Sequence, residues 1–76
     1  MNSGVQSATT VVEVTVNGAR VALNAGTSIS ELVARMGLEG RYAVEVNGAI
    51  LPRSMHAGRR LETGDRVEVV QAIGGG

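Results

Sequence analysis

The sequence predicts an α+β domain in which one amphipathic helix packs on one face of a small mixed sheet of four to five strands. Three observations lead to this class: valine-rich segments in which apolar and polar residues alternate, two Asn-Gly pairs that follow such segments, and one stretch with apolar residues at helical spacing. Alternation with a period of two is typical of half-buried strands, and spacing of three and four residues is typical of a helix. The chain has 76 residues, which suits one small domain.

The first predicted element is a β-hairpin. Residues 11–16 alternate as a strand does, with the valines at even positions on one face. Asn17-Gly18 follows, and this pair favours a two-residue hairpin turn because both central positions of that turn need positive φ. Alternation resumes over residues 20–24 and predicts the second strand, with its valine and leucine directed inward.

One helix is predicted after the hairpin, between Ser28 and Gly37. Ser28 and Glu31 have the spacing of a capping box, in which each side chain satisfies a free backbone N–H at the helix start. Glycine is common directly after the last helical residue, where Gly37 stands. The apolar stripe expected to face the core consists of Ile29, Leu32, Val33 and Met36.

A third strand and a short edge piece are predicted next. Residues 42–47 alternate again, and a second Asn-Gly pair leads into an extended piece at residues 49–51. Pro52 lacks the N–H that a central ladder needs, so this piece is expected at an edge of the sheet. Residues 53–61 are expected to be polar and irregular.

The last predicted strand spans residues 66–73 and follows a turn at residues 64–65. No internal repeat and no second domain is expected. The sequence therefore predicts a flexible N-terminal extension over residues 1–10, the α+β domain over residues 11–73, and a flexible C-terminal glycine tail over residues 74–76.

Composition argues against several classes of function. The chain has no cysteine, which excludes disulfides, thiolate catalysis and cysteine-ligated metal, and fits a reducing, cytoplasmic location. The formal net charge is zero and no stretch approaches the roughly 20 apolar residues of a membrane span, so neither nucleic acid nor a membrane is an expected partner. The single histidine, His56, is interpreted as a solvated loop residue, because a catalytic triad or a metal site needs partners that its sequence neighbours do not supply.

Arginine makes part of the second half of the chain locally basic. An RNA-binding patch would combine such residues with aromatic side chains for stacking, but Tyr42 is the one aromatic residue and acidic residues intervene. A solvated charged face is the favoured interpretation, and a protein-contact surface fits the same residues. The arginines concerned are Arg53, Arg59, Arg60 and Arg66.

The C-terminal residues offer a different chemistry. Gly74, Gly75 and Gly76 follow Ile73, and glycine has no Cβ, so such a tail can thread a narrow channel and present its carboxylate. The α-carboxyl has an ordinary pKa of about 3.3–3.7 and is ionised at neutral pH, so it must be activated before a nucleophile can attack it. The chain contains no phosphate-binding loop, so ATP, if used, must be bound by another protein.

Several segments together resemble the ubiquitin-like β-grasp sulfur carriers of the ThiS/MoaD superfamily, and more narrowly the ThiS family of thiamine biosynthesis. The resemblance covers residues 12–76. It departs from the family in ending with three glycines in place of two, and in the N-terminal ten residues. The segments that carry it are Asn17-Gly18, residues 27–33, residues 43–47, residues 50–54 with their Leu-Pro-Arg-Ser sequence, and residues 64–76 with Ala-Ile-Gly-Gly near their end.

The resemblance implies a non-enzymatic carrier that acts as a cosubstrate. A ThiF-type enzyme would adenylate the carboxylate of Gly76 with ATP, and a cysteine desulfurase would supply sulfur through a persulfide. The resulting thiocarboxylate would donate sulfur to a ThiG-type thiazole synthase, with Gly74 and Gly75 threading the partner's active site. The carrier itself is expected to bind no cofactor or metal, and to be monomeric when alone.

Three alternatives remain open. The molybdopterin-synthase small subunit is a sulfur carrier with the same fold and tail chemistry, although the Leu-Pro-Arg-Ser segment favours the thiamine family. A TGS-like β-grasp binding module would have no need of a free Gly-Gly end. A protein modifier conjugated to lysines would share the tail. The partner surface is expected on the sheet face near the last strand and around residues 53–60.

Overall fold

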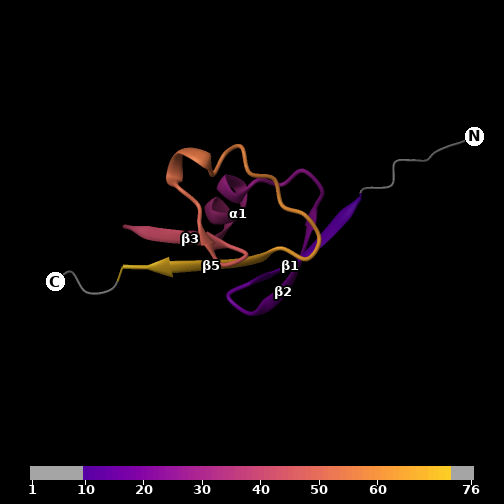
Figure 1. Cartoon of the computed structure of the whole chain (residues 1–76), viewed down its shortest axis with the longest axis horizontal. Coiled ribbons are helices and arrows are strands. Elements are labelled where there is room, and N and C mark those ends of the chain that lie inside the picture. Colours follow the sequence, from indigo (N-terminus) through magenta and orange to yellow (C-terminus); the bar gives the residue numbers. More distant parts are fainter. Residues whose placement is uncertain (1–9, 73–76) are drawn as a thin grey trace, which may run out of the picture.

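Five strands form one mixed sheet, and the helix lies against one of its faces (Figure 1). The computed structural model describes residues 10–72. In chain order the elements are β1 (Val11–Val16), β2 (Ala19–Asn24), α1 (Ile29–Met36), β3 (Tyr42–Val46), β4 (Ala49–Ile50), the 3-10 helix η1 (Arg53–Met55) and β5 (Arg66–Gln71).

The last strand lies in the middle of the sheet. The strand order is β2-β1-β5-β3-β4, in which β5 runs parallel to β1 and antiparallel to β3. The two outer strands, β2 and β4, each pair antiparallel with the strand that precedes them. This topology confirms the predicted α+β class and the β-grasp arrangement, including the position of the short piece β4 at an edge.

Both predicted hairpin turns are present. Asn17 and Gly18 have φ of 50° and 86°, and Asn47 and Gly48 have φ of 55° and 88°. Positive φ at both central residues is the requirement of the type I′ turn, whose twist matches that of the strands it joins. Asparagine and glycine are the residues that adopt this conformation at low cost, which is why the two pairs predict the turns correctly.

The helix begins and ends as its sequence predicts. Ser28 Oγ accepts a hydrogen bond from the Glu31 N–H at 3.1 Å, and Glu31 Oε1 accepts one from the Ser28 N–H at 2.9 Å, which completes the capping box. Because the charged form of Glu31 accepts this bond from the Ser28 backbone, its pKa lies below its ordinary value. Gly37 adopts the left-handed conformation that ends the helix.

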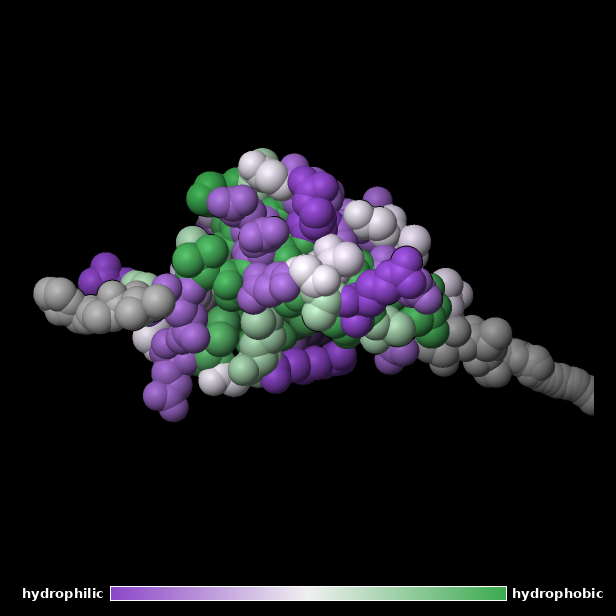
Figure 2. All heavy atoms as spheres, turned by 90° about the horizontal axis from the view of Figure 1, so that it is seen from below, coloured by the Kyte–Doolittle hydropathy of each residue, from purple (hydrophilic) through white to green (hydrophobic). Residues whose placement is uncertain are grey.

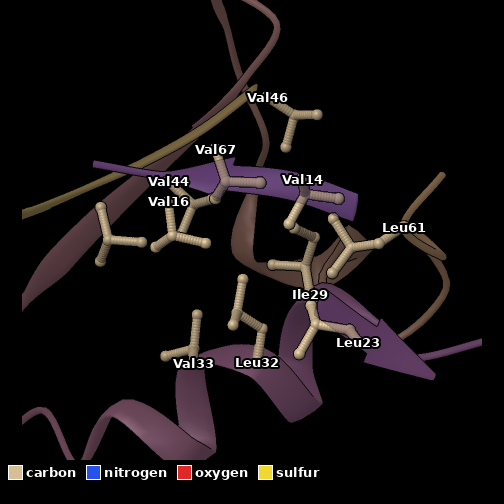
Figure 3. Packing of buried hydrophobic residues seen from close by; sticks show 11 residues of the cluster. Val14, Val16, Leu23, Ile29, Leu32, Val33, Val44, Val46, Leu61 and Val67 are labelled. Carbon is tan, nitrogen blue, oxygen red and sulfur yellow. The ribbon is translucent and has the colours of Figure 1, made fainter. Parts of the chain in front are cut away.

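Side chains from the sheet and the helix meet in one core (Figure 3). Valines of the sheet point toward the helix, and the helix contributes three of the four stripe residues that its sequence predicts, while the fourth, Met36, is half-buried. Branched aliphatic side chains thus fill an interior that has no phenylalanine or tryptophan. The buried residues are Val14, Val16, Leu23, Ile29, Leu32, Val33, Val44, Val46, Leu61, Val67 and Val69.

The segment from residue 53 to residue 61 is more ordered than predicted. It starts with η1, and its backbone caps the helix: the carbonyls of Arg59 and His56 accept the N–H groups of Ile29 and Ser30 at 2.9 and 3.1 Å. The free N–H groups at the start of a helix need such acceptors. The prediction of an irregular segment holds for residues 56–61, which belong to no named helix or strand, but it missed η1 at residues 53–55. It also missed Leu61, which is 2% exposed and completes the core from this segment.

Candidate functional site at the end of the last strand

The predicted site residues, Gly74, Gly75 and Gly76, lie outside the described residues, as do Ile73 and residues 1–9. The structure shows the position from which the tail continues, which is the end of β5. This end lies across the domain from the start of β1 (Figure 1). The surface around it, called the exit surface below, is formed by Arg41, Tyr42, Ala43, Val70, Gln71 and Ala72.

Hydrogen bonds hold the chain in place up to this surface. The Ala72 N–H donates to the Arg41 carbonyl at 3.0 Å, which continues the antiparallel pairing of β5 with β3 by one residue. The Gln71 side-chain amide donates to the Glu39 carbonyl at 2.8 Å. The direction in which the chain leaves the sheet is therefore fixed as far as Ala72.

The exit surface is a shallow hollow of about 240 Å³ with mostly apolar walls. Val70 is 57% exposed because its side chain lies on the sheet face away from the helix, opposite to the buried Val69. Ile50, 65% exposed, lies on the same outer face, since the pairing registers place it beside Glu45, two residues from the Val70 partner Ala43. On the face in Figure 2, hydrophobic residues lie among polar ones, including near the end from which the chain leaves β5.

An aromatic stack supports one side of the exit surface. The Arg53 guanidinium lies over the Tyr42 ring, with Cζ 4.8 Å from the ring centroid, and the His56 ring stacks on Tyr42 with a centroid distance of 6.3 Å. A cation over an aromatic face is attracted by the ring quadrupole. Arg53 is thus held beside the exit surface by a contact that leaves it exposed.

His56 lies in a different environment from the predicted solvated loop. It is only 5% exposed, and Nε2 lies 3.1 Å from the Leu51 carbonyl oxygen, to which it donates a hydrogen bond. The physical reason is the helix cap: the His56 backbone is drawn against the start of α1, which carries its side chain inward. The prediction of a solvated histidine was wrong, and these contacts give the residue a packing role.

The predicted solvated arginine face is also wrong at one residue. Arg53, Arg60 and Arg66 are exposed, but Arg59 is half-buried and pairs with the buried Asp65, with Nη1 3.1 Å from Oδ2. Sequence reasoning missed this pair, because five residues of loop lie between its members and no local pattern links them.

Asp65 collects three hydrogen bonds and an ion pair where the loop enters β5. Its Oδ1 accepts from Asn47 Nδ2 and Arg59 Nη2, at 3.0 and 3.2 Å, and its Oδ2 accepts from the Glu62 N–H at 2.8 Å. Oδ2 also lies 3.1 Å from Arg59 Nη1 in the ion pair. Burial opposes ionisation of this carboxyl and is the largest single influence on it. Together, the hydrogen-bond donors and the Arg59 charge outweigh the effect of burial and hold the pKa of Asp65 below its ordinary value.

The two turn asparagines form part of the same architecture. Asn47 Oδ1 accepts from the Arg66 N–H at 2.8 Å, at the start of β5. Asn17 Oδ1 accepts from the Val69 N–H at 2.8 Å, further along the same strand. Both side chains therefore fasten the strand that leads to the tail. The Asn-Gly signal predicts the turns but carries no information on these long-range bonds.

Two other kinds of site find no support in the part of the chain that the structure describes. Between residues 10 and 72, no three histidine, cysteine, aspartate or glutamate side chains cluster so that they could hold a metal ion. Neither described helix has the length and apolar character needed to cross a bilayer. The arrangement instead offers a packed core, an exit direction held by hydrogen bonds up to Ala72 and a partly apolar surface beside Arg41 and Arg53.

Comparisons with known proteins agree with this description. The model of the ThiS family matches residues 8–76. The crystal structure of the thiamine biosynthesis protein ThiS from Geobacter metallireducens is similar, with a TM-score of 0.72 and 28% identity over 86% of this chain and all of that one. A thiazole synthase from Paramagnetospirillum magneticum is 33% identical over 66 residues, which are 86% of this chain. The chain spans about a fifth (20%) of the length of that synthase.

The family model extends over the whole described domain and over the three terminal glycines. The similarity in three dimensions covers the complete G. metallireducens chain. The chain therefore belongs to the ThiS family of sulfur carriers, as its sequence predicts.

Proposed function

We propose that this protein carries sulfur for thiazole formation in thiamine biosynthesis, as a thiocarboxylate at the C-terminus of Gly76. The observation that carries the proposal is the family match, which continues through residues 74–76 and thus includes the tail as well as the domain. The position of β5 supports the proposal, because this central strand is held by hydrogen bonds and leads directly toward residues 74–76. In this role the protein is a cosubstrate that is used and regenerated, and not an enzyme.

The chemistry proceeds in two stages in the cytoplasm. A carboxylate oxygen of Gly76 attacks the α-phosphorus of ATP bound by a ThiF-type enzyme, and pyrophosphate leaves. A persulfide, formed by a cysteine desulfurase from cysteine, then attacks the acyl carbon and displaces AMP, and a second thiol cleaves the resulting acyl disulfide to release the thiocarboxylate. Activation is needed because the ionised carboxylate is a poor electrophile at neutral pH.

The domain contributes position to this chemistry and no reacting side chain. Four residues after Ala72 span at most about 14 Å when fully extended. The rim of the partner's active site must therefore contact the domain near the exit surface while the carboxylate reacts. A partly apolar hollow with Arg41 in its wall and Arg53 beside it has the mixed character of transient protein interfaces. Gly74 and Gly75 carry no side chain, which suits passage through a narrow channel.

The proposed acceptor is a ThiG-type thiazole synthase. The P. magneticum thiazole synthase contains a segment similar to this chain, and the whole polypeptide is about five times as long as that segment. Such a combination in one polypeptide supports a functional partnership between a carrier of this kind and the synthase. Sulfur then leaves the thiocarboxylate for the thiazole ring, and the free carboxylate of Gly76 returns for another cycle.

The proposal is tested by blocking the carboxylate. A variant with one alanine added after Gly76 is compared with a variant that carries the same alanine before Met1. We expect the C-terminal addition to abolish ATP-dependent adenylation by the ThiF-type enzyme, and the N-terminal addition to leave the rate unchanged. Equal activity of the two variants would contradict the proposal, and is the result that a TGS-like binding module would give.

A further inference from the structure

We propose that the side chain of Asn17 ends the two-sided pairing of β5 and thereby sets the point from which the tail is free to enter a partner. Asn17 is the first residue of the turn between β1 and β2, with φ of 50°. Its Oδ1 accepts from the Val69 N–H at 2.8 Å and its Nδ2 donates to the Val69 carbonyl at 3.4 Å. One side chain thus satisfies both backbone groups of a residue in the central strand.

The strand register explains why an amide side chain fits there. The last residue of β1, Val16, pairs with Val67 in parallel, and the Asn17 N–H donates to the Val67 carbonyl at 2.9 Å. Backbone groups of alternate residues in a strand point to the same side, so the next position on this side is Val69. β1 has already turned away toward β2 at this point. The Asn17 amide, which has the same donor and acceptor as a peptide group, takes the place of a further β1 residue.

The next residue on the same side of β5 is Gln71. Among residues 10–72, no hydrogen bond reaches its backbone from the β1 side, and Ala72 is bonded on the β3 side alone. Val69 is therefore the last residue of β5 whose backbone is bonded on the β1 side. Beyond it, the chain is paired on one side up to Ala72, so Asn17 decides how firmly the base of the tail is held and in which direction it points.

The second Asn-Gly turn provides a matched control within the same chain. Asn47 has φ of 55°, and its side chain also accepts from a backbone N–H of β5, but at Arg66, the first residue of that strand. Both asparagines therefore contribute turn geometry and long-range bonds, but they fasten opposite ends of β5, and the Asn47 amide also donates to Asp65. If Asn17 has a purely structural role, replacing either asparagine should change the protection of β5 in the same way. If Asn17 has a positioning role, the two replacements should change the protection at different ends of β5.

Amide hydrogen exchange measured by NMR tests whether Asn17 holds β5 at Val69. The measurement compares the wild type with Asn17→Gly, Asn17→Asp and Asn47→Gly. Glycine keeps the positive φ of the turn and removes the side-chain bonds. We expect Asn17→Gly to accelerate exchange of the Val69 amide about tenfold or more and to loosen Ala72, and Asn17→Asp to keep Val69 protected because it keeps the acceptor oxygen. Asn47→Gly should accelerate exchange at Arg66 and not at Val69. Unchanged protection of Val69 in Asn17→Gly, or equal loss there in Asn47→Gly, would overturn the proposal.

The consequence for sulfur transfer rests on the proposed carrier function. With the ThiF-type enzyme, Asn17→Gly should lower kcat for adenylation several-fold at an unchanged KM for the carrier, because the docking surface is intact and the tail enters the channel less often. Asn17→Asp should restore most of kcat, and Asn47→Gly should leave it unchanged at a temperature where both glycine variants are folded. Equal kcat for Asn17→Gly and the wild type would overturn this part. Failure of the wild-type chain to be adenylated would contradict the carrier function instead, while the exchange pattern would still decide the role of Asn17.

Discussion

Replacement of Asp65 by alanine should destabilise the fold more than most single changes, because three groups depend on its carboxylate. The Asn47 amide, the Glu62 N–H and the Arg59 guanidinium all donate to it, and Asp65 is only 6% exposed. Breaking a buried ion pair from one side costs about 3–5 kcal/mol. The Arg59 side chain is 30% exposed and regains water when its partner is lost, so the lower limit of about 3 kcal/mol applies.

This loss is large for a chain of this size. At roughly 0.05–0.15 kcal/mol per residue, a 76-residue domain has an unfolding free energy of about 4–11 kcal/mol. Urea denaturation followed by circular dichroism at pH 7 measures the change, with Glu68→Ala as control. Glu68 lies exposed on β5, the strand that follows Asp65, and an exposed substitution away from such bonds changes stability by less than about 0.5 kcal/mol. A loss below about 1 kcal/mol for Asp65→Ala would refute a major stabilising contribution of the hydrogen bonds to Asp65.

The same carboxyl predicts a pH dependence. Its pKa is lower in the folded state than the ordinary aspartate value of about 3.9, so the stabilisation is complete well above that value. Stabilisation is then lost as the pH falls below about 3.9 and through the lower folded pKa. The difference in unfolding free energy between the wild type and Asp65→Asn should therefore shrink as the pH is lowered from 6 to 2. A difference that stays constant over this range would show that the charge of Asp65 does not contribute.

Two further substitutions test the start of α1 and the core contribution of the segment from residue 53 to residue 61. Ser28→Ala removes the capping oxygen at 3.1 Å from the Glu31 N–H, and should lower the unfolding free energy in urea by about 1 kcal/mol; an unchanged midpoint would contradict a stabilising capping box. Leu61→Ala empties a position that is 2% exposed and should cost about 2–5 kcal/mol in the same assay, whereas a cost below about 0.5 kcal/mol would show that the segment after η1 does not complete the core.

Local signals in the sequence were sufficient for most of the fold. The Asn17-Gly18 turn, the capping box at Ser28 and the alternating valines each depend on residues within a few positions of one another. Pro52 placed the short strand at an edge for an equally local reason. These elements then have few ways to bury their apolar faces, so the sheet with one covering helix follows.

The errors fall on residues whose partners lie far away in the chain. His56 is buried because backbone carbonyls of its segment cap a helix that starts at Ile29. Arg59 is half-buried because Asp65 is anchored by Asn47 from another turn. Polarity along the chain does not reveal such contacts, which depend on the assembled fold. For the same reason the side-chain roles of the turn asparagines were not foreseen.

For the candidate site, too, some features could be predicted from the sequence and others could not. The family and the tail chemistry were predicted from the resemblance, and the family is confirmed by the comparisons. The roles of Gly74, Gly75 and Gly76, the domain boundaries at residues 10 and 73, and the ATP-using partner stay predictions. The structure adds the exit surface and the bonds that hold Ala72, which no pattern near the C-terminus indicates.

The most direct test of the carrier function is the intact mass of the chain after incubation with a ThiF-type enzyme, ATP, a cysteine desulfurase, cysteine and a thiol. Replacement of one oxygen of the terminal carboxyl group by sulfur should raise the mass by about 16 units, and fragmentation should place the increase on Gly76. Omission of ATP should abolish the increase. An unchanged mass in the complete mixture, or an increase located outside residues 74–76, would contradict the account.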